Sequence, residues 1–190
     1  ADVVLGEAVL RRDVDRLLSA VDDLALTGVG AKDLQANITE RLERALDKIA
    51  SLQKRVDEAT AVDETKDVAR DLAAWRKDAY VSLTENAGIF VVWGNGEALL
   101  EKAENRIFQV RQTLKSLKLQ DEIEIQRLFE QAKVQSLHAE ENHLKAKQGI
   151  ERFSRSEEII GYIHASLDDL HSLYGALLNL STVVANTVKQ

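Results

Sequence analysis

Apolar residues recur at alternating spacings of four and three along most of this chain, and proline is absent from its 190 residues. Such spacings place side chains on one face of an α-helix, which has about 3.6 residues per turn. Proline interrupts helix interiors, so its absence leaves long helices unbroken. Together the two features predict a few long helices joined by short connections, without a sheet.

The repeating apolar faces divide the chain into five or six expected helices. The most regular face belongs to the second of them, and it is made of Ile38, Leu42, Ala45, Ile49, Leu52, Val56 and Ala59. The expected helices cover about residues 3–27, 33–59, 64–92, 97–118, 121–152 and 154–188. Short connections make successive helices antiparallel neighbours. The predicted fold is therefore an elongated antiparallel bundle with heptad packing, forming one all-α domain over residues 1–190.

Two short segments decide where the middle helices end. Gly94-Asn-Gly96 is expected to form the tip of a helical hairpin, because glycine is favoured just after the end of a helix. Between Lys118 and Asp121 the apolar phase slips by about one residue. Either a helix breaks there, or one very long helix continues through a stutter. Continuity is slightly favoured, because no glycine or proline marks a turn.

Composition narrows the possible functions. The net charge is −7, and a nucleic-acid partner requires a basic face, so we expect none. Cysteine is absent, which leaves no disulfide and no thiolate nucleophile or metal ligand. No serine-nucleophile signature occurs either, and we predict neither enzymatic activity nor a cofactor. The chain does not begin with Met, so we expect it to be a piece of a longer protein.

The segment His138-Ala-Glu-Glu-Asn-His143 has the residue types of a metal site. Glu140 and His143 form a Glu-x-x-His pair on one helix face. A carboxylate-bridged di-iron bundle needs two such pairs and two further glutamates. A second Glu-x-x-His pair is absent from the sequence, and Asp168 with His171 is the nearest substitute. A solvated helix face explains the segment more simply, and we predict no metal site.

A candidate site for a small ligand begins with Trp75, Arg76, Lys77 and Tyr80, which lie within about a turn and a half of one helix. An aromatic ring flanked by cations can hold a small organic anion. The alternative is a core aromatic ring beside basic side chains that extend to solvent. If a ligand binds between helices, the residues expected to contact it are Trp75, Arg76, Tyr80, Asn86 and Arg106.

The run Ile89, Phe90, Val91, Val92, Trp93 is apolar on every side of the expected helix. One face of an amphipathic helix cannot hold all five residues. Three explanations remain open. Neighbouring helices cover the run, or it contacts a partner or a second copy of the chain, or it is a tip that inserts into a membrane.

Two stretches of the sequence, Trp75-Arg-Lys-Asp-Ala-Tyr-Val-Ser-Leu83 and Val92-Trp-Gly-Asn-Gly-Glu-Ala-Leu-Leu100, resemble the periplasmic helical-bundle ectodomains of bacterial chemoreceptors and sensor kinases. In that family a long helix ends in a Gly/Asn turn and an alanine-rich helix follows. The resemblance implies an extracytoplasmic location and a homodimer formed through the first helix. It also implies that a small organic ligand or a partner protein binds between helices, with membrane segments flanking the domain.

These observations favour a non-enzymatic sensing or protein-interaction module. The resemblance implies that this module is the extracytoplasmic ligand-binding domain of a bacterial signal-transduction receptor. The alternative is a membrane- or lipid-interacting helical protein, pore-forming or lipoprotein-like, that uses the tip at Ile89 to Trp93.

Overall fold

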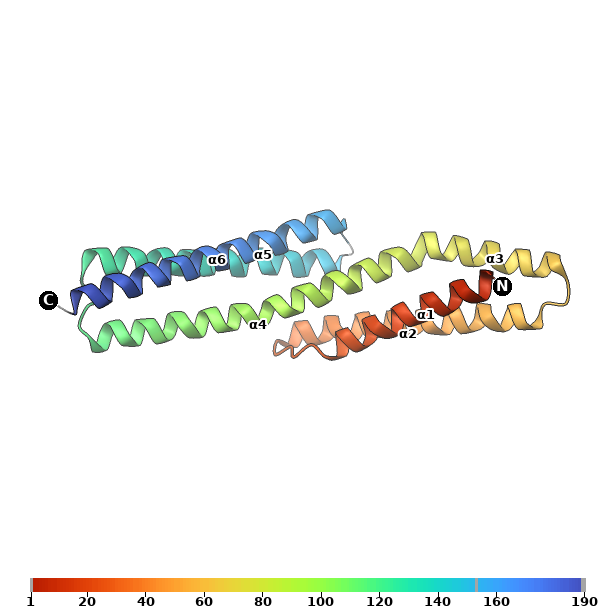
Figure 1. Cartoon of the computed structure of the whole chain (residues 1–190), viewed down its shortest axis with the longest axis horizontal. Helices are drawn as coiled ribbons and strands as arrows, with labels where there is room; N and C mark the ends of the chain where they lie inside the picture. Colours follow the sequence, from red (N-terminus) through yellow and green to blue (C-terminus); the bar gives the residue numbers. More distant parts are fainter. Residues whose placement is uncertain (1, 153, 189–190) are drawn as a thin grey trace. The chain divides into compact units, whose positions relative to one another are not determined.

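The computed structural model describes residues 2–152 and 154–188, and over these residues it is built from helices without any strand. The order along the chain is α1 (Asp2–Asp22), α2 (Val29–Glu58), α3 (Val62–Trp75), the π-helix η1 (Arg76–Tyr80), α4 (Val81–Ser116), α5 (Ile123–Glu151) and α6 (Ser156–Thr187) (Figure 1). The prediction of an all-α helical bundle is confirmed.

The chain divides into two compact units, residues 1–92 and residues 93–190. Unit 1 contains α1, α2, α3, η1 and the first part of α4. Unit 2 contains the rest of α4 with α5 and α6. The single-domain assignment stays a prediction, because compactness alone does not measure whether a part folds independently.

The core of unit 1 follows the apolar repeat of α2. Ile38, Leu42, Ile49 and Leu52 of the predicted face are all almost completely buried. On α1, Val14 and Val21 are buried in the same way, and α1 packs against α2. The apolar faces that the sequence predicts for these two helices therefore meet each other.

The connection between α2 and α3 is closed by one carboxylate. Oε2 of Glu64 accepts hydrogen bonds from the backbone N–H groups of Thr60 (2.8 Å) and Ala61 (3.2 Å). These bonds stabilise the charged carboxylate and lower the pKa of Glu64. They also satisfy backbone donors that the start of α3 would otherwise leave without partners.

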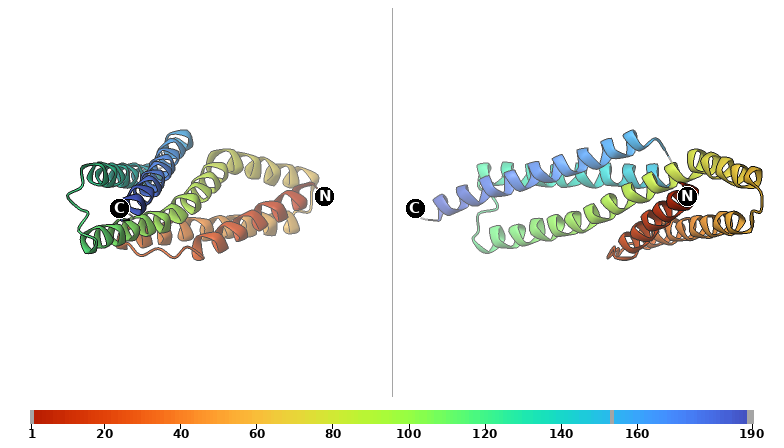
Figure 2. Two further views of the ribbon diagram at one scale, coloured as in Figure 1. Left: turned by 60° about the vertical axis from the view of Figure 1, so that its left-hand side comes forward. Right: turned by 45° about the vertical axis from the view of Figure 1, so that its right-hand side comes forward.

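In unit 2, α5 and α6 lie side by side in all three views (Figures 1 and 2). Small residues on α5 allow this approach, since Ala132, Ser136, Ala139 and Ala146 are buried. The backbone of Ala139 is close enough to α6 for its carbonyl to accept a hydrogen bond from the Ser166 hydroxyl at 2.8 Å. The small side chains on this face of α5 thus allow a close contact with α6.

The expected hairpin tip at Gly94-Asn-Gly96 is wrong, because α4 passes through these residues without a break. Glycine in a helix interior costs about 1 kcal/mol relative to alanine. The buried neighbours Trp93, Leu100 and Ala103 offset that cost, because all three leave water when the helix continues. No described glycine has a positive φ angle.

The segment after α4 is a turn, which decides between the two alternatives in favour of a break. Helix α4 ends at Ser116 and α5 begins at Ile123. Lys118 has a left-handed backbone with φ of 57°. The turn resolves the phase slip, because it lets Ile125 and Leu128 join the same core as Leu114. The slight preference for a continuous helix was wrong.

Candidate functional site

Unit 1 contains a groove between α1 and the segment formed by α3 and η1. Its volume is about 550 Å³, which lies within the range of small-molecule sites. The lining is Gly6, Leu10, Ala69, Leu72, Ala73, Arg76, Lys77 and Val81. Most of this surface is aliphatic, and the only charged groups among the lining residues are the two cations Arg76 and Lys77.

The two cations come from the π-helix η1, which is a local irregularity of an otherwise α-helical segment. A π-helix widens the turn, and such turns occur frequently at functional sites. Neither Arg76 nor Lys77 makes an ion pair with another described residue. The groove therefore combines an apolar surface with positive charge that the described fold leaves uncompensated.

Aromatic rings hold the π-helix against α1. The rings of Trp75 and Tyr80 are tilted against each other, with centroids 5.4 Å apart. The hydroxyl of Tyr80 donates a hydrogen bond to the carbonyl oxygen of Leu10 at 3.3 Å. Burial raises the pKa of Tyr80, and the charge of Asp13 raises it further. Tyr80 is therefore a structural tie between α1 and η1, and its hydroxyl is engaged by the backbone.

The five residues predicted to contact a ligand are not gathered at one point. Trp75, Arg76 and Tyr80 lie together in unit 1, and of these Arg76 lines the groove. Asn86 is buried, and its Nδ2 donates to the carbonyl oxygen of Ser82 at 2.7 Å. Arg106 belongs to unit 2 and donates to Gln109 of its own helix.

Asn86 is engaged within its own helix and is not placed to contact a ligand in the groove. Its side chain bonds to the preceding turn of its own helix, and Oδ1 is buried without a hydrogen-bond partner among the described residues. A buried amide oxygen without a partner is costly. Asn86 is not among the residues that line the unit 1 groove.

The apolar run at Ile89 to Trp93 is mostly covered. Phe90 and Trp93 are almost completely buried, Ile89 is buried and Val91 is half-buried. Only Val92 is exposed. Among the described residues no helix is both long and apolar enough to span a bilayer. Most of the run is thus covered, and it lies in the first half of α4.

Trp93 and His143 form a stacked and hydrogen-bonded pair in unit 2. Their rings are stacked, with centroids 4.7 Å apart and an angle of 15° between the planes. Nε1 of Trp93 also donates to the carbonyl oxygen of His143 at 3.0 Å. Gly96 lies beside the imidazole, and a Cβ at this position would make an ordinary contact of 3.5 Å with Cε1 of His143. Trp93 thus joins α4 to α5.

Burial controls the protonation of this arrangement. It lowers the pKa of His143 to about 4, and the charge of Lys147 acts in the same direction. The imidazole is therefore neutral at pH 7. Its Nε2 is buried and has no hydrogen-bond partner among the described residues. Burial raises the pKa of the neighbouring Glu97, while Lys147 opposes that rise.

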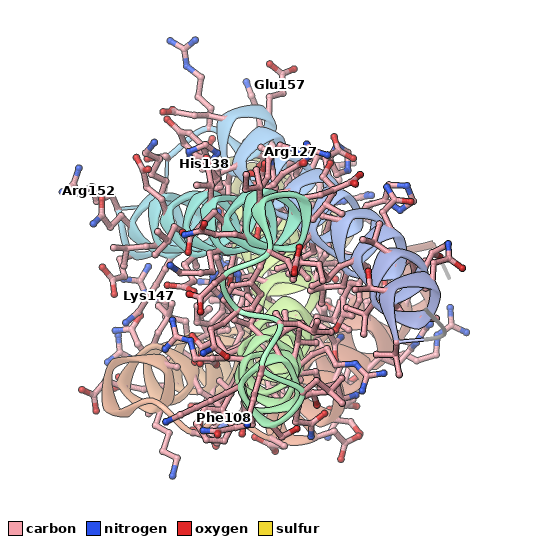
Figure 3. The ribbon with its side chains drawn as sticks, turned by 90° about the vertical axis from the view of Figure 1, so that its left-hand side faces the viewer. Phe108, Arg127, His138, Lys147, Arg152 and Glu157 are labelled. Carbon is pink, nitrogen blue, oxygen red and sulfur yellow. The ribbon has the colours of Figure 1, made fainter. Side chains whose placement is uncertain are left out.

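The two histidines of the Glu-x-x-His segment lie on different sides of α5. Figure 3 shows His138 on the side of α5 that faces away from α4, whereas His143 faces α4 and stacks on Trp93. No group of three or more potential His, Cys, Asp or Glu ligands occurs in the described part of the chain. Glu140 accepts a hydrogen bond from Ser136 on its own helix at 3.3 Å.

No protein-family model, curated protein or solved structure matches the chain.

Sequence reasoning found the cations of the unit 1 groove but missed its apolar surface. Gly6, Ala69 and Ala73 are small residues on helices whose apolar repeats continue past them. Small residues at helical spacing on two neighbouring helices leave space between the helices. This spacing is the sequence feature that could have predicted the groove. Stacking of Trp93 on His143 joins residues fifty positions apart, and no pattern within either segment indicates it.

Proposed function

We propose that the protein is a non-enzymatic helical sensing or interaction module whose unit 1 groove binds an amphipathic organic anion. The observation that carries the proposal is the combination of an apolar groove of about 550 Å³ with two uncompensated cations, Arg76 and Lys77. Apolar walls bind a hydrocarbon chain, and the cations bind a carboxylate or a similar acidic group.

The lining of the groove supports binding without catalysis. It contains no carboxylate, imidazole or hydroxyl group, and its ionisable side chains are the cations Arg76 and Lys77. The π-helix supports a sensing role, because one extra residue in a turn is a feature that can shift when a ligand engages its side chains. An extracytoplasmic receptor domain is the finer form of the proposal, supported by the resemblance of residues 75–83 to that family.

The membrane-inserting alternative has no comparable support. It requires an exposed apolar tip at Ile89 to Trp93, and four of these five side chains are buried or half-buried.

A titration followed by tryptophan fluorescence tests the proposal, because Trp75 lies next to the cations of the groove. Decanoate is the probe, and decyltrimethylammonium is the control with the same chain and the opposite charge. We expect decanoate to change the emission and the ammonium compound to have little effect. The double change of Arg76→Gln and Lys77→Gln should weaken decanoate binding by at least about tenfold. Equal binding of both probes, or a flat titration with decanoate, would contradict the proposal.

A blocking variant separates groove binding from adsorption elsewhere. A Cβ at Gly6 meets no atom within 4 Å, so Gly6→Leu should fold normally and occupy the groove. Gly161→Leu is the matched control, because Gly161 is also helical, also has open space at Cβ and lies in unit 2. Decanoate binding should be lost in the first variant and unchanged in the second.

A further inference from the structure

A second groove lies in unit 2, between α4 and α5. Its volume is about 240 Å³. The residues that matter for its properties are Glu104, Phe108, Arg111, Lys133, Leu137 and Glu140. Helices α4 and α5 run in opposite directions here, because the short turn at residues 117–122 connects them. Each helix contributes one acidic, one apolar and one basic residue to this set: Glu104, Phe108 and Arg111 come from α4, and Glu140, Leu137 and Lys133 come from α5.

The charges are sorted to opposite ends of this groove. Glu104 and Glu140 lie together at one end, and the charge of Glu104 adds to burial in raising the pKa of Glu140. Arg111 and Lys133 line the other end. Seven residues separate acid from base on each helix, which corresponds to about 10 Å. Like charges thus face each other across the helix pair.

The fold does not compensate most of these charges. None of Glu104, Glu140 and Arg111 makes an ion pair with another described residue, whereas Lys133 pairs with Glu130 on its own helix at 2.8 Å. The guanidinium of Arg111 lies over the ring of Phe129, 5.9 Å from its centroid. Like charges placed side by side are unfavourable in an isolated unit. A partner with the opposite charge order would relieve them.

The middle of the groove is apolar and open to water. Phe108 and Leu137 are each 60% exposed, which is unusual for two large side chains that line the same groove. Figure 3 shows Phe108 at the surface of α4 and Lys147 on the side of α5 toward α4. Glu140 and Lys133 precede Lys147 by one and two heptads, so they share that side of α5.

We propose that this groove is the surface through which two copies of the chain associate. The surface is self-complementary about a two-fold axis that crosses the groove at its midpoint. Such an axis places Glu104 opposite Arg111 of the second copy, and Glu140 opposite Lys133 of the second copy. Phe108 and Leu137 lie next to the axis and lose contact with water. This surface differs from the first-helix contact implied by the receptor resemblance, and the proposal does not depend on ligand binding in unit 1.

A charge exchange between two variants tests the pairing. A basic variant carries Glu104→Lys and Glu140→Lys, and an acidic variant carries Arg111→Glu and Lys133→Glu. Sedimentation velocity over a wide concentration range measures self-association. We expect the wild type to associate and each variant alone to associate at least about 100-fold more weakly, because each surface then carries one sign of charge. An equimolar mixture of the two should recover association to within about tenfold of the wild type.

A substitution at the apolar centre provides an independent measurement. Phe108→Asp should also abolish association, and it should leave the helical circular dichroism unchanged because the side chain is already exposed. Leu178→Asp is the matched control, since Leu178 is an exposed apolar residue on α6. It should associate like the wild type. Phe108→Asp carries the test by itself if a charge-reversed variant loses its helical signal.

Three outcomes would overturn the proposal. The wild type could remain monomeric at every concentration, which would leave the groove to a small dipolar molecule. Association could persist in both charge variants and in Phe108→Asp, which would place the contact elsewhere, with the first helix as the next candidate. Association could also be lost in both charge variants without recovery in the mixture, in which case charge pairing is not its cause.

Discussion

Two segments of the chain reverse the usual relation between glycine and helix ends. Residues 94–96 contain two glycines and lie inside α4, while residues 117–122 contain none and form the turn between α4 and α5. The first segment follows the buried Trp93, and Gly96 lies beside the ring of His143. The second is exposed apart from the half-buried Leu119. The comparison shows that burial on both sides of a segment outweighs local helix propensity.

The largest expected loss of stability comes from removing the buried side chain of Trp93. Trp93→Ala should lower the free energy of unfolding by about 3–5 kcal/mol, because it leaves a cavity and deprives the His143 carbonyl of its Nε1 donor. Leu119→Ala in the turn should cost only about 1 kcal/mol, since Leu119 is partly exposed. Chemical denaturation measures both values. Similar losses at the two sites would show that burial at Trp93 is not what holds the helix through the glycines.

The second-largest expected effect is a pH dependence of the unfolding free energy, caused by the protonation of His143. Its pKa is about 4 in the folded protein and near 6.5 in the unfolded chain, so the unfolded chain binds an additional proton between these values. Stability therefore falls as the pH drops from about 6.5 to 4, by about 2 kcal/mol after allowance for partial exposure. The raised pKa of Glu97 opposes this loss, because the folded state then binds a proton more readily.

Comparison with His143→Phe isolates the contribution of the imidazole. The phenyl ring preserves stacking on Trp93 and does not titrate. The unfolding free energy of this variant should depend less on pH between 4 and 6.5 than that of the wild type. Parallel pH profiles of the two proteins would show that His143 is not the titrating group.

Glycine substitutions test which helical glycines are required for packing. Gly96→Ala should stabilise unit 2 by about 1 kcal/mol, because the new Cβ would make an ordinary contact of 3.5 Å with His143 and alanine favours helix. Gly149→Ala should instead destabilise by about 1–2 kcal/mol, because its Cβ would lie 2.8 Å from Cγ1 of the buried Ile159. Thermal unfolding of both variants should give shifts of opposite sign, and shifts of the same sign would contradict these contacts.

The smallest expected change in stability comes from a substitution in the turn between α4 and α5. Lys118→Gly should stabilise the protein by about 0.5–1 kcal/mol, because lysine is strained at its φ of 57° and glycine is not. Lys115→Gly, one turn earlier in α4, is the matched control and should destabilise by a similar amount. A loss of stability at Lys118 would indicate that this turn does not require the left-handed backbone.

The sequence predicted the fold class because apolar periodicity is a local property of each helix. The buried face of α2, from Ile38 to Leu52, follows it directly. Part of the candidate site was also predicted, since Arg76 lines the unit 1 groove. The hairpin tip at residues 94–96 was wrong because the contact between Trp93 and His143 favours the continuous helix, and that contact is formed by residues far apart in the sequence.

The amino-acid sequence by itself determined that this chain is helical and which faces of its helices are apolar. It also determined that no cysteine thiol lines either groove. Tertiary structure alone decided where α4 ends, which ring Trp93 stacks on, and which charges share a groove. The physical reason is the range of each interaction. Periodicity acts within a few turns of one helix, while burial, stacking and charge pairing depend on residues that only folding brings together.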